Sequence, residues 1–207
     1  MSIQDRAPAT TITTEFLPKK VTETAPPANT GTRRTVTVRA PVLAVLRIVM
    51  GLTFLWAFLD KMFGLGYATS AAKAWINGGS PTKGFLASVH VGPLQSVLRA
   101  WAGTGWADWL FMLALLGIGV ALTLGIGMRI AGVSGTVLLA LMWIASWPLA
   151  QHTSTGSPTS STNPVIDEHL FLIAALIAVM LGAAGTVWGL GKWWHQQRIV
   201  QRHQWLR

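Results

Sequence analysis

The chain has 207 residues, of which 51% are hydrophobic and only 11% are charged, whereas a soluble domain carries about 25% charged residues. It contains no cysteine, which excludes disulfides, thiolate nucleophiles, cysteine-ligated iron–sulfur clusters and covalent c-type haem within this chain. The formal net charge is +9, but the basic residues flank the apolar stretches, so the pattern indicates a membrane protein in a lipid bilayer and no nucleic-acid binding.

Residues 1–38 are rich in Thr and Pro and are predicted to be a disordered cytoplasmic tail. Four apolar stretches follow, at residues 41–60, 106–126, 130–149 and 165–187. Each approaches the ~20 residues that a helix needs to cross a hydrocarbon core of about 30 Å. Because a backbone in lipid must satisfy its own hydrogen bonds, the sequence predicts an all-α, four-helix transmembrane bundle over residues 39–190, with a basic tail at 191–207.

The positions of the basic residues predict the orientation. Both tails are basic, and Arg129 lies in the short turn between the second and third stretches. By the positive-inside rule, we expect a multi-pass protein of the cell membrane with both termini in the cytoplasm.

Small residues at four-residue spacing, such as Ala121 with Gly125, favour close packing of helices, either within the chain or between copies.

The loop between the first two stretches, residues 62–105, is too long to be a mere connection. It contains no acidic residue, and its basic residues, together with Lys61, form a cationic cover over the outer helix ends; they are Lys73, Lys83, His90 and Arg99. Such a cover would attract small anions or contact anionic lipid headgroups, and both interpretations stay open.

Three ionisable residues of the first stretch need an explanation. Arg47 lies near its inner end, where it either extends to the inner headgroups or contacts an anion or a quinone inside the bundle. Asp60 and Lys61 end the stretch and, as neighbours on a helix, point about 100° apart. A lysine suits the negative end of the helix dipole, but an aspartate opposes it, so Asp60 needs a partner or has a function.

Further ionisable residues are predicted at the outer ends of the other stretches. Asn163 as an N-cap, Pro164 in the first turn and acids after them are ordinary helix-start chemistry. His169 adds nothing favourable to that dipole, so it is the stronger functional candidate. The whole outer cluster comprises Asp60, Lys61, Asp108, His152, Asp167, Glu168 and His169, and His90 could join it.

Three segments resemble the DoxX/DoxD family: "LRIVMGLTFLWAFLDKMFG" in the first stretch, "AWINGGSPTKGFL" in the long loop and "NPVIDEHLFLIAALIAVMLG" at the fourth. The resemblance covers about residues 41–190. It implies a four-helix membrane subunit. It also implies, for the DoxD branch, the large subunit of a thiosulfate dehydrogenase that oxidises thiosulfate to tetrathionate, passes the electrons to membrane quinone and acts with a small subunit.

The first functional hypothesis is therefore a redox membrane subunit with quinone as its cofactor. His169 and Asp60 would exchange protons with the quinone, and Lys61 with the loop bases would hold a small anionic substrate. The other candidate contacts for quinone or substrate are Arg47, Asp108, His152, Asp167 and Glu168.

A second hypothesis is a non-catalytic scaffold for a partner oxidoreductase, assembled with a partner subunit or as a homo-oligomer. An anion transporter is least favoured, because transporters place polar residues near the membrane midplane and these stretches have few. No metal site is predicted. Haem stays open, with His152 and His169 as the candidate axial pair.

Overall fold

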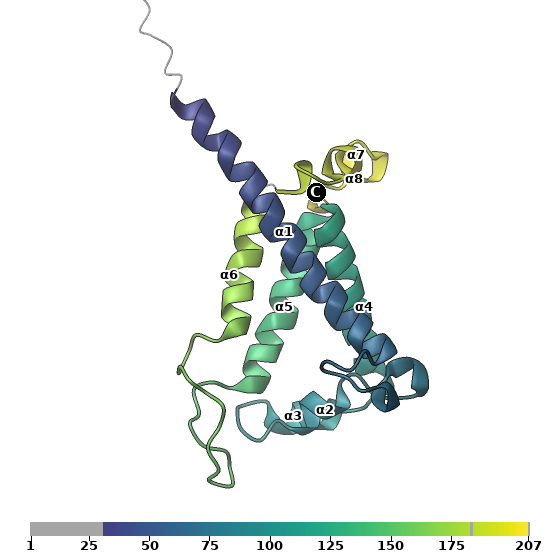
Figure 1. Cartoon of the computed structure of the whole chain (residues 1–207), viewed down its shortest axis with the longest axis vertical. Coiled ribbons are helices and arrows are strands. Elements are labelled where there is room, and N and C mark those ends of the chain that lie inside the picture. The colour runs from purple at the N-terminus through teal and green to yellow at the C-terminus, as the bar shows by residue number, and fades with distance from the viewer. Residues whose placement is uncertain (1–30, 183, 207) are drawn as a thin grey trace, which may run out of the picture.

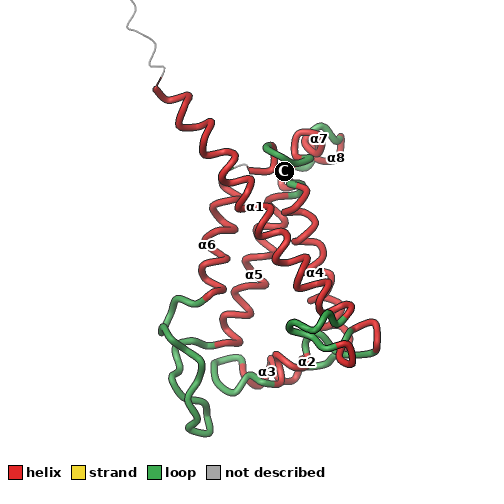
Figure 2. The backbone as a smooth tube through the Cα atoms, in the orientation of Figure 1, coloured by secondary structure: helices red, strands yellow, loops and turns green. Residues whose placement is uncertain are grey.

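The computed structural model describes residues 31–182 and 184–206, with side chains described from Ala40 onward except for Gln204. This part of the chain consists of helices joined by loops and contains no strand (Figure 2). Three helices are long and apolar enough to cross a membrane: the Ala40–Phe63 part of α1 (Gly31–Phe63), α4 (Gly105–Leu124) and α5 (Met128–Ser146). They coincide with the first three predicted stretches.

The long helices form a bundle with α6 (Glu168–Leu181), and α1 runs obliquely across α4 and α5 (Figure 1). The segments α2 (Lys83–Ala87) and α3 (Gln95–Trp101) and the 147–167 loop gather at one end, which we call the loop end. The start of α1 and the C-terminal segments lie at the other, the terminal end. The shorter segments are η1 (Ala71–Lys73), η2 (Trp75–Asn77), η3 (Ala184–Thr186), α7 (Gly191–His195), α8 (Arg198–Arg202) and η4 (Gln204–Leu206).

Two helix boundaries differ from the sequence-based expectation. Helix α1 begins at Gly31, inside the predicted disordered tail, whose residues 1–30 lie outside the described part. Helix α5 ends at Ser146 rather than at 149. Trp147 there adopts a left-handed conformation with φ 40°, and it precedes Pro148, which disfavours helical backbone at the preceding residue.

The fourth stretch is shorter than expected. Its helix α6 spans only 14 residues, from Glu168 to Leu181, instead of 165–187. At ~1.5 Å per residue this is about 21 Å, less than the ~30 Å of a hydrocarbon core. The described chain therefore has three candidate spans and a shorter apolar helix.

The surfaces of the long helices are suited to lipid. Only 28%, 39% and 33% of the most apolar windows of α1, α4 and α5 are buried inside the protein. Large apolar side chains point outward along each of them, including Val45, Val49, Leu52, Trp56, Leu110, Leu113, Val133 and Val137. A soluble monomer rarely exposes apolar patches of this extent, so the chain is a multi-pass membrane protein surrounded by lipid.

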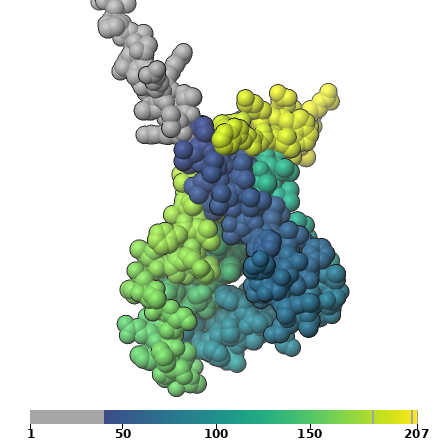
Figure 3. Space-filling model, in the orientation of Figure 1, coloured from purple at the N-terminus to yellow at the C-terminus, as the bar shows by residue number. Residues whose placement is uncertain are grey.

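The core lies where α1, α4, α5 and α6 meet. Its buried side chains include Met50, Phe54, Met112, Leu115, Ile118, Leu122, Leu139, Leu176 and Val179. Toward the loop end α1 and α6 diverge, and a narrow opening separates them on the molecular surface (Figure 3).

Glycines let the helices of this chain approach one another closely. A side-chain carbon at Gly51 would lie 2.6 Å from the backbone nitrogen of Thr123, so α1 and α4 are in backbone contact there. Gly119 packs in the same way against Leu55, and Gly135 against Leu176. Gly51, Gly119 and Gly135 therefore serve packing within the chain.

We expect Gly51→Val to lower the unfolding free energy by about 1–3 kcal/mol, because overpacking forces α1 away from α4. The matched control is Gly117→Val, since a side-chain carbon at Gly117 meets open space. That control should change stability by no more than about 0.5 kcal/mol. The measurement is thermal or denaturant unfolding in detergent micelles, and equal effects of the two substitutions would contradict the packing argument.

Candidate functional site

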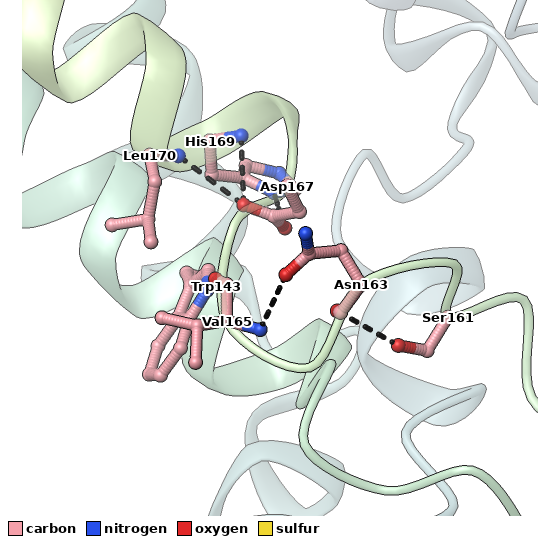
Figure 4. A network of polar contacts seen from close by, with 7 residues as sticks. All are labelled: Trp143, Ser161, Asn163, Val165, Asp167, His169 and Leu170. Carbon is pink, nitrogen blue, oxygen red and sulfur yellow. Dashed lines mark hydrogen bonds and ion pairs between the residues drawn. The ribbon is translucent and has the colours of Figure 1, made fainter.

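The start of α6 holds a histidine–aspartate pair. Asp167 is the N-cap of the helix, and its Oδ1 accepts hydrogen bonds from the backbone nitrogens of His169, at 3.0 Å, and Leu170, at 3.2 Å. Its other oxygen, Oδ2, lies 2.7 Å from Nδ1 of His169 (Figure 4). One carboxylate thus caps the helix and orients the imidazole, an arrangement we call the dyad.

The dyad defines which nitrogen of His169 is available for chemistry. A neutral imidazole that donates from Nδ1 to the carboxylate presents Nε2 as a proton acceptor. The ring is held in place, because His169 is only 6% exposed. A carboxylate at Nδ1 also stabilises the charged imidazolium after Nε2 takes up a proton.

The turn before the dyad differs from the predicted helix start. The prediction that Asn163 is the N-cap is wrong, since Asp167 has that role. Asn163 Oδ1 instead accepts hydrogen bonds from the backbone nitrogens of Val165 and Ile166, at 3.0 and 2.9 Å, and so closes a turn of its own. Trp143 of α5 donates from Nε1 to the carbonyl of Val165 at 2.9 Å, which fixes this turn against the bundle (Figure 4).

A cavity of about 580 Å³ lies beside the dyad at the loop end. It is lined by the dyad and Glu168, by His90 and Ser88 from the long loop, and by Ser146 at the end of α5. The hydroxyl-rich run 159–162 completes its wall. The structure therefore brings a second histidine, His90, to the same cavity as His169, although 78 residues of sequence lie between them. We call this space the histidine cavity.

Another candidate of this face, His152, has different surroundings. His152 is exposed, pairs with Pro158 in an isolated β-bridge and does not line the histidine cavity. His152 and His169 therefore do not line one cavity, and haem binding by this pair stays an untested expectation. Among the residues that the structure describes, no group of three histidine or acidic side chains is arranged to hold a metal ion.

Asp60 and Lys61 also lie apart from the dyad, and neither lines the histidine cavity. Asp60 is 1% exposed, and its carboxylate accepts hydrogen bonds from the backbone nitrogens of Tyr67 and Ala68, at 3.3 and 3.0 Å. It closes the turn after α1, which explains an acid at the unfavourable end of the helix dipole. The Nζ of Lys61 lies over the ring of Phe111, 5.9 Å from its centroid.

Asp108 fastens the long loop to the start of α4. Its Oδ1 accepts hydrogen bonds from Ser80 Oγ at 2.9 Å and from the nitrogen and hydroxyl of Thr82, at 3.0 and 2.6 Å. Thr82 Oγ1 in turn accepts from the backbone nitrogen of Gly103 at 3.3 Å. Asp108 is 6% exposed, so these bonds are shielded from water.

We expect Asp108→Ala to loosen this loop, because hydrogen bonds to a charged acceptor contribute about 1.5–3 kcal/mol. Trypsin cleavage after Lys83 should become roughly tenfold faster or more, since cleavage follows the population of the opened loop. The control is Glu168→Ala, an exposed acid at the same end of the molecule. Unchanged cleavage of Asp108→Ala would show that the loop is held by other contacts.

Arg47 is fully buried near the terminal end, so the interpretation that it extends to the headgroups is wrong. Its Nη1 donates to the carbonyls of Leu122 and Thr123, the latter at 2.9 Å. Its Nη2 donates to Val187 and Trp188, at 3.2 and 2.9 Å. The guanidinium thus joins the C-terminal end of α4 to the 187–188 turn, and only Nε remains without a partner in the described structure.

Comparison of the chain with protein-family models, curated proteins and solved structures finds no match. The resemblance to the DoxX/DoxD family therefore stays a prediction, and the site is interpreted from its own geometry. The sequence indicated His169 but not the double role of Asp167. An acid two residues before a histidine at a helix start is the signal for that role, because an N-cap side chain lies close to the residues that follow it.

Proposed function

We propose that this chain is the membrane subunit of a quinone-linked oxidoreductase, in which the dyad exchanges protons with quinone bound at the loop end. The observation that carries this proposal is the buried His169 imidazole, held by Asp167 at the wall of a cavity of about 580 Å³. The resemblance to the DoxX/DoxD family suggests thiosulfate or another small sulfur anion as the electron donor.

The chemistry requires both electrons and protons. Two thiosulfate ions release two electrons when they form tetrathionate, and a quinone that takes up two electrons also takes up two protons. An imidazole can take up and release a proton at a ring nitrogen, so the His169 side chain suits this exchange. The electron-transfer centre belongs to a partner subunit in this proposal, because the chain has no cysteine with which to hold an iron–sulfur cluster.

The dyad replaces the proton-exchange pair expected from the sequence. Asp60 has its carboxylate directed at two backbone amides and does not line the histidine cavity. His90 lines that cavity and is exposed, so it provides a second proton carrier between His169 and water. We assign the proton exchange to His169, with His90 as its neighbour on the path.

We further propose that the terminal end faces the cytoplasm of a cell-membrane protein. The start of α1 and the C-terminal segments lie at this same end (Figure 1). Arg129 lies in the first turn of α5, and Lys192, Arg198 and Arg202 lie in the C-terminal segments α7 and α8. Basic residues favour the cytoplasmic side. The histidine cavity would then open on the outer side.

A non-catalytic scaffold is the second candidate function. It is favoured by the number of ionisable groups that bind the protein's own backbone, namely those of Arg47, Asp60 and Asp108. In this alternative the loop end docks a partner oxidoreductase, and the dyad only caps α6.

The two functions differ in their dependence on quinone. Membranes with and without the chain are compared for thiosulfate-dependent reduction of quinone, and the purified chain is extracted with solvent to recover bound quinone. We expect quinone to copurify and turnover to require the chain. A chain that lacks bound quinone, and that is needed only to retain a partner in the membrane, would favour the scaffold.

A further inference from the structure

A second pocket at the loop end has a different character from the histidine cavity. It has a volume of about 230 Å³ and lies beneath α2 and α3, against α4 and α5. Its wall is aromatic and aliphatic, with Phe85, Trp101, Trp106, Phe111 and Leu138 among the lining residues. Phe85 of α2 lines both spaces, so the two are neighbours. We call it the apolar pocket.

Lys61 is the one charged residue among the described residues that line this pocket. Its ammonium lies 5.9 Å from the ring centroid of Phe111. Among the described residues no carboxylate oxygen lies within 4 Å of Nζ of Lys61. The neighbouring Asp60 directs its oxygens at backbone amides. The ammonium therefore stands in an apolar wall near the charge of Asp60 but with no carboxylate in direct contact.

The pocket is accessible from the lipid. Leu110 and Trp106, which line it from α4, are 62% and 53% exposed on the outer surface of a candidate membrane span. Lys61 lies in the last turn of α1, close to the end of the apolar span. An occupant could enter sideways from the bilayer, with its polar end at the level of the headgroups.

We propose that the apolar pocket binds an amphiphile, a hydrocarbon chain that ends in an anionic group, with the anion on Nζ of Lys61. A cavity of about 150 Å³ is enough to bind benzene, so the apolar pocket accommodates the first part of such a chain, and the remainder extends into the bilayer. This site is separate from the histidine cavity and does not rest on the proposed quinone chemistry.

The head group must provide the selectivity of this site. A hydrocarbon chain gains little by moving from lipid into a protein pocket, because lipid tails are as apolar as leucine side chains. A charge-assisted hydrogen bond at the edge of the hydrocarbon region is stronger than one in water. Binding should therefore depend on the charge of the head group and on Lys61.

The test measures binding of radiolabelled oleate, oleyl phosphate and oleyl alcohol to the protein in lipid nanodiscs, after subtraction of empty discs. We expect one or both of the anionic amphiphiles to bind roughly ten- to a hundredfold more tightly than the alcohol. The stronger of the two identifies the head group as a carboxylate or a phosphate. Equal binding of all three molecules would overturn the proposal.

Variants separate the pocket from general attraction of anions to a basic surface. Lys61→Met should reduce binding of the anionic amphiphile to the level of the alcohol, whereas Lys61→Arg should retain most of it. Ala114→Phe, which fills the pocket from α4, should reduce binding equally. The control is Lys73→Met, an exposed lysine of the long loop, and it should keep full binding. Full binding by Ala114→Phe or by Lys61→Met would refute the site.

Discussion

Replacement of Arg47 by methionine is expected to lower the unfolding free energy by at least about 3 kcal/mol, because buried carbonyls lose a charged donor. Methionine has a similar length and leaves the apolar packing in place. What it removes is the set of hydrogen bonds to the carbonyls of Leu122, Thr123, Val187 and Trp188. Because Arg47 is fully buried, no bulk water reaches these carbonyls to replace that donor.

The backbone packs closely around the guanidinium of Arg47. Its guanidinium lies against Gly125, where a side-chain carbon would come within 2.9 Å of Nη1, and against Gly189, where one would come within 3.0 Å of Nη2. These glycines allow the end of α4 and the 187–188 turn to surround the charge. Since the carbonyls at the end of α4 carry the negative end of the helix dipole, the cation is favourable there.

Thermal unfolding in detergent measures this effect, with Arg99→Met as the matched control, because Arg99 is an exposed arginine of α3. The control should change stability by no more than about 0.5 kcal/mol. Arg47→Lys should lie between the two, since an ammonium lacks the planar fork that reaches several carbonyls. A melting temperature of Arg47→Met equal to that of Arg99→Met would mean that Arg47 is not a structural clamp.

The second large effect is expected on turnover. Asp167→Asn should reduce quinone-coupled oxidation roughly 10²-fold or more, the range of a single proton-exchange contribution. The amide oxygen of asparagine can still cap α6, so stability should stay within about 0.5 kcal/mol of the native value. The amide nitrogen, however, would donate to Nδ1 of His169 and force the proton onto Nε2, which removes the acceptor that the proposed chemistry needs.

Two further variants, His169→Gln and Glu168→Gln, test whether the loss of turnover is specific to the dyad. His169→Gln should lose as much turnover as Asp167→Asn, and the double variant should lose little more, because the two residues act as a unit. Glu168→Gln changes an exposed acid next to the dyad and should keep turnover within a few-fold. Asp60→Asn should also retain most of its turnover. Normal turnover of Asp167→Asn would remove the dyad from the mechanism.

The structure agrees with the sequence-based predictions more closely for the long helices than for the contacts of the ionisable side chains. The first three stretches became α1, α4 and α5 because long apolar runs are a strong local signal. The length of the fourth helix was overestimated, because the apolar composition continues past Leu181 although the helix ends there. The loop-end location of Asp60, Asp108 and His169 followed from the alternation of helices, but the structure does not group them into the one site that the sequence predicted.

The sequence by itself determined that this is a helical membrane protein and which stretches form the long helices, because the requirement for ~20 apolar residues is local. Only the tertiary structure decided the partner of each ionisable group. Arg47 binds carbonyls 75 and 140 residues away, and His90 and His169 share a cavity through the folding of the long loop. Such partners depend on which backbone groups and side chains the packing brings near, and spacing along the chain does not contain that information.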